Sequence, residues 1–316
     1  MTAVYFLGVD GGGTKTRFAL LDADKKLVGE ATLGTSYHPE VGLDGVRDVL
    51  ARGVGEVLAD AGINSTEIAF AFFGLPAYGE DSKATPVLQS MPASILGHDR
   101  YTVDNDMICG WAGSLGAEDG INIVAGTGSI GYGQRKGRSA RAGGWGETFS
   151  DEGSAYWIAM QGLNAYSRMS DGRLPKGPLH TFVSEALNLT NDLDLCAHVN
   201  GIGATARSEL AKLSLVVAKA AGAGDYAALE VFRLAGQELA QIADALRLKL
   251  GYDADEPVRL SYSGGAFSAG DVLLTPFKQA LTASSPAFVL CRPLYDPHYG
   301  AALYAQSLNA RSISAP

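Results

Sequence analysis

Cysteine is scarce in this sequence, and its placement excludes a disulfide-stabilised protein. Only Cys109, Cys196 and Cys291 occur among the 316 residues. Their number is odd, and they lie far apart without a recognisable spacing, so no disulfide framework is indicated. We therefore expect three reduced thiols and a cytoplasmic protein.

Positive charge and long apolar runs are also in short supply. The 25 basic residues are outnumbered by 34 acidic ones, which gives a net charge of -9, and they form no cluster. This balance argues against a nucleic acid or an anionic membrane as a partner. No apolar run reaches the ~20 residues of a membrane-spanning helix, and Met1–Val4 leads into a strand rather than a signal peptide.

Glycine, by contrast, is abundant, with 40 residues, and it gathers in turns between apolar segments. The stretch Tyr5–Phe18 reads YFLGVDGGGTKTRF: an apolar strand ends in Asp10, and a turn of three glycines, Thr14 and Lys15 leads into a second extended segment. Bare backbone N–H groups in such a turn can approach a phosphate. The acid at the strand end is placed to hold the magnesium of a nucleotide. A glycine-rich hairpin without a ligand is the alternative.

A second copy of this pattern favours the phosphate interpretation. Ile121–Gly133, INIVAGTGSIGYG, is again a strand, a Gly-Thr-Gly-Ser turn and an extended stretch, with Thr127 in the place of Thr14. The spacing of its glycines also fits a dinucleotide fingerprint, but that fingerprint requires a helix directly after the turn. Tyr132–Arg141 has no helical period. The repeat therefore predicts two similar domains facing each other across a cleft.

The sequence is 47% hydrophobic, which is enough for a large core. The remaining apolar patterns predict an alternation of strands and helices. Ser150 is the expected N-cap of the first helix in the second half, with Asp151 and Glu152 in its first turn. The polar tail at 310–316 is expected to fray. Further strands are predicted at 27–33, 68–73, 100–104, 258–261 and 288–291, and helices at 43–61, 81–89, 107–116, 154–163, 210–217, 229–250 and 296–307, with a loop at 34–39.

Five motifs together resemble one family. In chain order they are Asp10-Gly-Gly-Gly-Thr-Lys-Thr16, Gly126-Thr-Gly-Ser129, Gly143-Gly-Trp-Gly146, Asp151-Glu-Gly-Ser154 and Ser263-Gly-Gly265. This combination is similar to the N-acetylglucosamine kinase branch of the actin-like ATPase superfamily. The branch also contains glucosamine kinases and the activator ATPases of 2-hydroxyacyl-CoA dehydratases and benzoyl-CoA reductase.

The resemblance implies an α/β fold of two ribonuclease-H-like domains, of which the second is helix-rich. We place the first domain at residues 1–117 and the second, with a helical insertion, at 118–295. A closing helix at 296–316 is expected to pack back on the first domain. The resemblance also implies a cytoplasmic enzyme that is often a homodimer.

Phosphoryl transfer requires that the nucleotide charge be neutralised and that the acceptor hydroxyl be held in line and deprotonated. The two turns predict an ATP site, in which Ser263-Gly-Gly265 resembles the turn that supports adenosine in the family. Asp10 is the candidate ligand of Mg²⁺, held through water. The predicted ATP-binding residues are Gly11, Gly12, Gly13, Thr14, Lys15, Thr127, Gly128, Ser129, Gly264 and Gly265.

Asp106 is the candidate general base. It follows the predicted strand at 100–104, where the family keeps its catalytic aspartate. A positioned base contributes about 100- to 10,000-fold to a rate. The alternatives are that Asp106 only caps the next helix, or that Asp104 is the base, since strand alternation puts both on one face.

The predicted amino-sugar site combines an aromatic face with a carboxylate. In the family the residues that match Trp145 and Asp151 lie at the sugar, with Gly144 beside them. An indole can cover a pyranose, and a carboxylate can accept hydrogen bonds from its hydroxyls. A Trp145 buried in the core and an Asp151 that merely starts a helix are the alternatives.

The sequence departs from the family where the sugar's substituents are read. Ser36, Tyr37 and His38 stand in the loop where kinases of the branch carry an asparagine, and they are the remaining candidate substrate contacts. These departures leave the identity of the amino sugar open. We expect an ATP-dependent kinase that phosphorylates the 6-hydroxyl of N-acetylglucosamine, with glucosamine or another amino sugar as the alternative acceptor.

Two functions of other classes compete with the kinase. An activator ATPase would need cysteines spaced to hold an iron–sulfur cluster, and the three cysteines lack that spacing. A non-catalytic nucleotide switch would bind ATP without turnover that a sugar stimulates.

Overall fold

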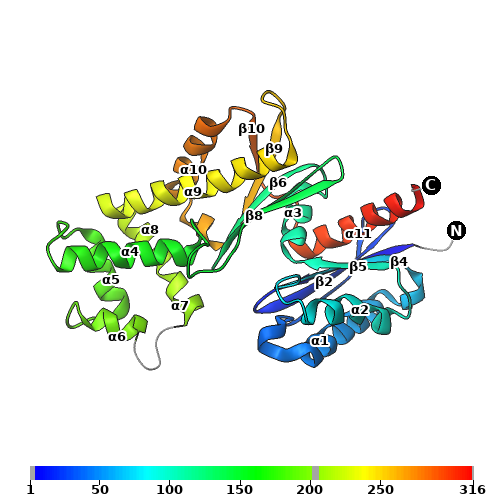
Figure 1. Cartoon of the computed structure of the whole chain (residues 1–316). Helices are drawn as coiled ribbons and strands as arrows, with labels where there is room; N and C mark the ends of the chain where they lie inside the picture. Colours follow the sequence, from blue (N-terminus) through cyan, green and yellow to red (C-terminus); the bar gives the residue numbers. More distant parts are fainter. Residues whose placement is uncertain (1–3, 201–205, 315–316) are drawn as a thin grey trace. The chain divides into compact units, whose positions relative to one another are not determined.

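The computed structural model of the chain describes residues 4–200 and 206–314, which form two compact units (Figure 1). Unit 1 contains the described residues up to Asp119 together with those from Arg292 onward. Unit 2 is Gly120–Cys291. Each unit is built on a five-stranded mixed sheet.

The sheet of unit 1 has the strand order β3-β2-β1-β4-β5. Its first three strands are an antiparallel meander, whereas β4 and β5 run parallel to β1. The apolar run of β1 is buried on both faces, as is usual for a strand covered by helices on each side. The strands are β1 (Tyr5–Gly11), β2 (Lys15–Asp22), β3 (Leu27–Gly34), β4 (Ile68–Leu75) and β5 (Tyr101–Asn105).

Four helices cover the two faces of this sheet. Helices α1 (His38–Ala61) and α2 (Ala84–Leu96) pack on one face, and α3 (Met107–Leu115) and α11 (Pro297–Ser314) on the other (Figure 1). A Cβ on Gly8 would lie 2.1 Å from the backbone N of Ala302, so α11 rests directly on the backbone of β1. The C-terminal helix is therefore part of the core of unit 1.

Unit 2 repeats this plan with the strand order β10-β9-β6-β7-β8. Three antiparallel strands again come first, and β9 and β10 run parallel to β6. Helices α9 (Tyr226–Leu250) and α10 (Asp271–Ser284) pack together and against the sheet. The strands are β6 (Gly120–Ala125), β7 (Ser129–Arg135), β8 (Arg138–Gly143), β9 (Val258–Ser263) and β10 (Phe288–Cys291).

A helical insertion separates β8 from α9. In Figure 1, α4 leads away from the strands of unit 2, and α5 and α6 lie near its far end. They share one apolar core with α9 and the sheet, which explains why this unit has the larger core. The inserted helices are α4 (Ala155–Ser170), α5 (Pro178–Leu187), α6 (Asp194–Asn200), α7 (Arg207–Lys212) and α8 (Ser214–Gly222). Two 3-10 turns, Ser65–Glu67 and Gly265–Ala269, complete the secondary structure.

Several local predictions were wrong in their boundaries. Helix α1 is interrupted at Gly42, whose φ of +70° and ψ of 169° are not helical, so the helix predicted from residue 43 is preceded by an unpredicted turn from His38 that has Pro39 near its start, where proline is well tolerated. Helix α2 begins at Ala84 and continues past Pro92 to Leu96. Helix α11 extends through the predicted polar tail to Ser314. Residues 315–316 of that tail lie outside the described residues.

The predicted cap of α4 was also wrong. Ser154, not Ser150, is the N-cap, and its hydroxyl accepts a hydrogen bond from the backbone N of Trp157 at 3.1 Å. Asp151 and Glu152 therefore precede the helix instead of forming its first turn. Helices α5, α6 and α10 were not predicted, and α7 and α8 were predicted as one helix.

Within residues 4–200 and 206–314, no helix combines the length and the hydrophobicity that crossing a membrane requires.

Candidate active site

Three acidic residues lie at the carboxyl edge of the sheet in unit 1. In the parallel ladders Asp10 is opposite Gly74, and Gly74 is opposite Asp104. Asp106 follows β5 directly, and its backbone N donates to the O of Leu75 at 3.3 Å. Acids that are distant in the sequence thus lie together at the carboxyl ends of the parallel strands. This is the edge where open α/β sheets usually bind ligands.

The charge of Asp106 affects the pKa of Asp10. Burial, followed by the negative charge of Asp106, raises the pKa of Asp10 to about 7. Burial, followed by the charge of Glu80, raises the pKa of Asp106 to about 7. Burial also raises the pKa of Asp104, but Asp104 is not among the charges that act on Asp10. Of the two acids at the end of β5, Asp106 is therefore the one whose charge shifts the pKa of Asp10.

A buried thiol, Cys109, lies close to these two acids and to β1. The Sγ of Cys109 is 3.5 Å from the O of Val9, and burial raises its pKa well above the usual range of a thiol. A Cβ on Gly74 would lie 2.2 Å from this Sγ and 3.2 Å from the Cα of Asp106. Only glycine at position 74 leaves room for the thiol and for the backbone of the candidate base.

The first glycine turn is open to ligands on its outer side. Thr14 and Lys15 are exposed, and a Cβ on Gly13 would meet no atom within 4 Å. Gly12 is tied to the next loop, because the hydroxyl of Thr35 donates to its O at 2.8 Å. The exposed backbone of this turn is compatible with the predicted phosphate contact.

The predicted substrate residues after β3 have polar atoms without partners among the described residues. Ser36 is buried beneath Gly11, where a Cβ would lie 2.4 Å from its Oγ. Within the described chain, neither this Oγ nor the Nδ1 of His38 has a hydrogen-bond partner, although both atoms are buried. Tyr37 is exposed. Buried polar atoms are normally hydrogen-bonded, so Ser36 and His38 are suited to contact a polar ligand.

The second glycine turn, in unit 2, is bonded to the start of α4. The hydroxyl of Ser129 donates to the O of Glu152 at 2.7 Å, and the N of Ala155 donates to the O of Gly126 at 2.8 Å. Thr127 is exposed at the tip of the turn. The two motifs that the sequence analysis treated separately therefore form one hydrogen-bonded assembly.

Gly264, in the motif that follows β9, lies against the second glycine turn. Its φ is +101°, and a Cβ there would lie 2.5 Å from the O of Ala125 and 2.7 Å from the N of Gly126. Gly265 follows it and is exposed. The structure thus brings the predicted nucleotide residues after β9 against those after β6, as the parallel ladder between these strands requires.

Neither Trp145 nor Asp151 has the purely structural position that was its alternative, a place in the core or in the first turn of a helix. Trp145 is 72% exposed, so it is not a core residue. Gly144 has a φ of +70°, and a Cβ there would lie 2.8 Å from Ile130. Asp151 is buried, and its Oδ2 accepts a hydrogen bond from the Nη2 of Arg207 at 2.5 Å. An exposed indole and a buried carboxylate are consistent with a sugar site.

Arg207 was missed by the sequence analysis. It is the first residue of α7, 56 positions after Asp151, and no motif surrounds it. Only the tertiary structure brings its guanidinium to Asp151 and to Glu147, whose Oε2 is 3.2 Å from Nη1.

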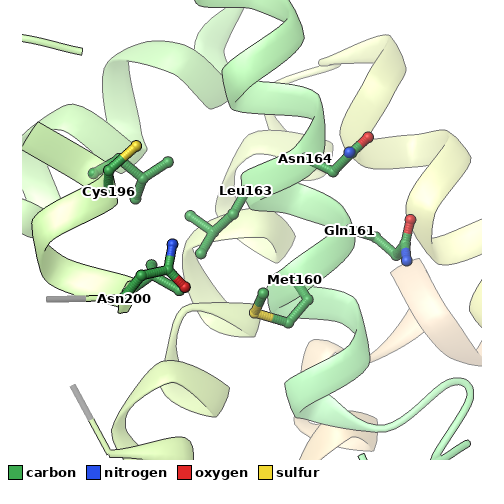
Figure 2. A pocket seen from close by; sticks show the side chains of 8 residues that line it. Met160, Gln161, Leu163, Asn164, Cys196 and Asn200 are labelled. Carbon is green, nitrogen blue, oxygen red and sulfur yellow. The ribbon is translucent and has the colours of Figure 1, made fainter. Parts of the chain in front are cut away.

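Several cavities border α4 in unit 2. Figure 2 shows side chains that line a cavity between α4 and α6, among them Met160 and Cys196. The volume of this cavity is about 410 Å³. A second cavity of about 590 Å³ lies beside the residues that precede α4, including Ser150 and Glu152. None of the predicted site residues lines either cavity.

Comparison with known proteins identifies the family. The profile of the BadF/BadG/BcrA/BcrD ATPase family matches residues 7–305. The chain belongs to the BadF/BadG/BcrA/BcrD ATPase family. This match extends over both units and over every motif described above. It confirms the predicted membership of an ATPase family that includes activators.

The curated relatives of this ATPase-family chain are kinases. It is 30% identical over 304 residues to the N-acetylmuramic acid/N-acetylglucosamine kinase of Clostridium acetobutylicum, covering 96% of this chain and 98% of the relative. It is 29% identical over 317 residues to the N-acetyl-D-glucosamine kinase of Dictyostelium discoideum, with the same coverage. These relatives confirm the prediction of a kinase.

Solved structures agree with this assignment. A structure from Chromobacterium violaceum, assigned by name to the N-acetylglucosamine kinases, is 25% identical with a TM-score of 0.68, covering 97% of this chain and all of the other. A ROK family glucokinase from Streptomyces griseus, 17% identical with a TM-score of 0.58 over 96% of this chain and 99% of the other, shares the fold. The predicted α/β class is confirmed.

Proposed function

We propose that this protein is an ATP-dependent amino-sugar kinase that transfers the γ-phosphoryl group to the 6-hydroxyl of N-acetylglucosamine. The observation that carries the proposal is the pair Asp10 and Asp106 at the carboxyl edge of the sheet in unit 1. The names of the full-length relatives support an amino sugar as the acceptor.

Asp106 is proposed as the general base. A base is most effective when its pKa lies near the working pH, and burial with the charge of Glu80 raises the pKa of Asp106 to about 7. Its backbone is fixed by the hydrogen bond to Leu75, and the bare backbone of Gly74 lies beside it. Asp106 would accept the proton of the sugar hydroxyl as that oxygen attacks phosphorus.

Asp10 is proposed to hold Mg²⁺, and its surroundings fit this role. Its pKa is raised by burial and by Asp106, so a cation would relieve the cost of two neighbouring charges. Mg²⁺ is usually held by one or two carboxylates and by phosphates. When bound, it would neutralise charge on the transferred phosphoryl group. Thr14 and Lys15, beside the first turn, would contact the same phosphates.

The residues of unit 2 are proposed to bind the nucleotide and the sugar. The turn at Gly126–Ser129 is proposed to contact phosphate through its backbone, and Gly264 and Gly265 are the proposed adenosine contacts. Trp145 would cover the apolar face of the pyranose, because its indole is exposed. Asp151 would bind polar groups of the sugar, and Ser36 and His38 of unit 1 stay predicted substrate contacts. The cytoplasmic location and the homodimer stay predictions.

The test is ADP release from Mg-ATP with a panel of acceptors: N-acetylglucosamine, glucosamine, N-acetylmannosamine, N-acetylmuramic acid, glucose and no sugar. We expect strong stimulation by N-acetylglucosamine. Stimulation by a different amino sugar would keep the reaction class and change the acceptor. Slow ATP hydrolysis that no sugar alters would overturn the kinase and favour a nucleotide switch or an activator.

The metal assignment has a separate test. Asp10→Ala should weaken the dependence of turnover on Mg²⁺, so that the half-saturating concentration rises by at least about tenfold, equivalent to ~1.4 kcal/mol. Asp22→Ala, at the far end of β2, is the matched control. An unchanged magnesium titration in Asp10→Ala would reject the assignment.

A further inference from the structure

Arg207 holds a network of charges at the start of the helical insertion. Its Nη2 donates to the Oδ2 of Asp151 at 2.5 Å, and its Nη1 lies 3.2 Å from the Oε2 of Glu147. Its guanidinium carbon is also 5.6 Å from the centre of the Tyr156 ring. One cation therefore joins the loop before α4, α4 itself and α7.

The Asp151 end of this network is unusual in two ways. Asp151 has a φ of +59°, a left-handed conformation that is uncommon for a residue with a side chain. Its side chain is only 7% exposed. A buried carboxylate is costly without a partner, so the guanidinium compensates its burial. A strained backbone and a buried charge at one residue are typical of functional sites.

The same ion pair rests on the second glycine turn. A Cβ on Gly128 would lie 2.7 Å from the Oδ2 of Asp151 and 3.2 Å from the Nη2 of Arg207. The carboxylate and the guanidinium therefore touch the backbone of the turn proposed to bind phosphate. The Nε of Arg207 is buried and has no hydrogen-bond partner within the described part of the chain. The guanidinium thus has its Nη2 close to that turn and an unused donor at Nε.

We propose that Arg207 is a positioning residue that couples nucleotide binding at Gly126–Ser129 to sugar binding at Asp151. The proposal rests on the proposed kinase function. A phosphate on the turn attracts the guanidinium, because an arginine binds phosphate oxygens at least as strongly as it binds a carboxylate. The carboxylate of Asp151 then shares its hydrogen-bonding capacity with a sugar hydroxyl. Nucleotide binding therefore raises the affinity for the sugar, and the effect is reciprocal.

A purely structural role makes a different prediction. If Arg207 only attaches α7 to the loop before α4, its loss lowers stability and weakens both ligands independently. The coupling between the two ligands then stays unchanged. The ratio of sugar affinities with and without nucleotide separates the two roles, because a general loss of stability cancels in this ratio.

The experiment is calorimetric titration of the full chain with N-acetylglucosamine, in the absence and presence of magnesium β,γ-imido-ATP, which is not hydrolysed. In the wild type we expect the nucleotide to tighten sugar binding by about 5- to 150-fold, the usual range of coupling between two sites. In Arg207→Gln the ratio should fall to within about twofold of one. Arg207→Lys should recover part of the coupling, because lysine keeps the charge without the planar fork.

Lys212→Gln is the matched control. It lies on the same helix and removes an exposed ion pair with Glu209, so coupling should equal that of the wild type. Arg207→Gln with wild-type coupling would overturn the proposal. Absence of coupling in a wild type that binds the sugar would also overturn it and leave the kinase function standing. A wild type that binds no sugar would instead contradict the proposed function. If Arg207→Gln does not fold, Arg207→Lys decides, and undiminished coupling there contradicts the proposal.

Discussion

The carboxyl ends of the two sheets share a topology but differ in charge. In unit 1 this edge carries Asp10 and Asp106, and the pKa of each is raised to about 7. In unit 2, β6 and β9 match β1 and β4; they end in Ala125 and Ser263, and glycines follow both, whereas β10, which matches β5, ends in Cys291. The charged groups nearest the second turn belong to the ion pair described above, which comes from the loop before α4 and from α7.

This difference shows that the repeated fold sets where ligands bind, whereas individual side chains set what is bound. In both units a parallel strand lies beside the first strand of an antiparallel meander. The carboxyl ends of these two strands therefore lie at the same edge of the sheet. Acids at that edge suit proton transfer and a cation. Neutral glycine backbone suits a phosphate. We therefore expect substitutions at the acidic edge of unit 1 and at the glycine-rich edge of unit 2 to have different effects on activity and stability.

The largest effect is expected at the acidic end. Asp106→Asn should keep the affinities for nucleotide and sugar but lower kcat at least about 100-fold, equivalent to ~2.7 kcal/mol of transition-state stabilisation. Steady-state kinetics with binding titrations would measure both. Asp104→Asn is the matched control, since Asp104 does not act on the pKa of Asp10. Near-normal turnover in Asp106→Asn would remove the role, and a large loss in Asp104→Asn would transfer it.

The two strand-end glycines provide a direct comparison of packing. Gly264→Ala places a Cβ 2.5 Å from the backbone of Ala125 at a φ of +101°, and Gly74→Ala places one 2.2 Å from the Sγ of Cys109. Each should lower the free energy of unfolding by at least about 1–3 kcal/mol. The cost of Gly74→Ala should be smaller in a Cys109→Ala background, because the obstructing sulfur is absent there.

Urea denaturation of the single and double variants measures this cycle. Cys109→Ala should leave the cost of Gly264→Ala unchanged, since that Cβ meets backbone of unit 2 rather than a side chain. Equal costs of Gly74→Ala in both backgrounds would show that Cys109 is not the obstacle.

The raised pKa values at the acidic end predict a pH-dependent stability. An unfolded aspartic acid has a pKa near 3.9, whereas Asp10 and Asp106 have values of about 7 in the folded chain. Between these values the unfolded state binds fewer protons, so the contribution of these groups to the free energy of unfolding falls as pH rises. The double variant Asp10→Asn/Asp106→Asn should reduce this fall by at least ~1.4 kcal/mol, one pKa unit.

Thermal or urea unfolding between pH 4.5 and 7.5 measures this slope, without nucleotide. Asp22→Asn is the control, because Asp22 lies at the other end of β2. A double variant with the slope of the wild type would contradict the buried-pair interpretation.

The smallest effect is expected at the start of α4, which is bonded to the second turn. Ser154→Ala removes the hydrogen bond to the N of Trp157 and should cost about 1 kcal/mol. Ser150→Ala is the matched comparison, because its hydroxyl contacts the side chain of Glu152 rather than a helical N–H. Denaturant midpoints of the two variants measure the difference. A larger loss in Ser150→Ala would reverse the assignment of the cap.

Local patterns predicted the parts of the structure that depend on neighbouring residues. The two glycine turns, the strands around them and the long helix that ends at Leu250 follow from apolar periodicity and glycine placement. The short helices α5 and α6 were missed, because their stretches have few fully buried apolar positions. Tertiary contacts support such helices more than their own sequence does.

The candidate site was predictable where a strand end or a motif marks it, and not where a distant residue completes it. Asp10 and the two glycine turns follow from the sequence, and Asp106 follows from it together with the resemblance. The choice of Asp106 over Asp104 needs the electrostatic environment, because alternation alone leaves both open. The interpretation of Trp145 needs the exposure of its indole in the structure, because the motif alone does not exclude a position in the core.

The repeated strand–turn–strand plan and the family can be recognised from the chain alone, because both depend on short motifs of neighbouring residues. Which charges meet depends on the three-dimensional fold. The parallel ladder through β4 brings Asp10 and Asp106 together, and the fold of the insertion carries Arg207 to Asp151 across 56 positions. Electrostatic interactions depend on distance in space and on burial, and neither can be read from separation along the chain.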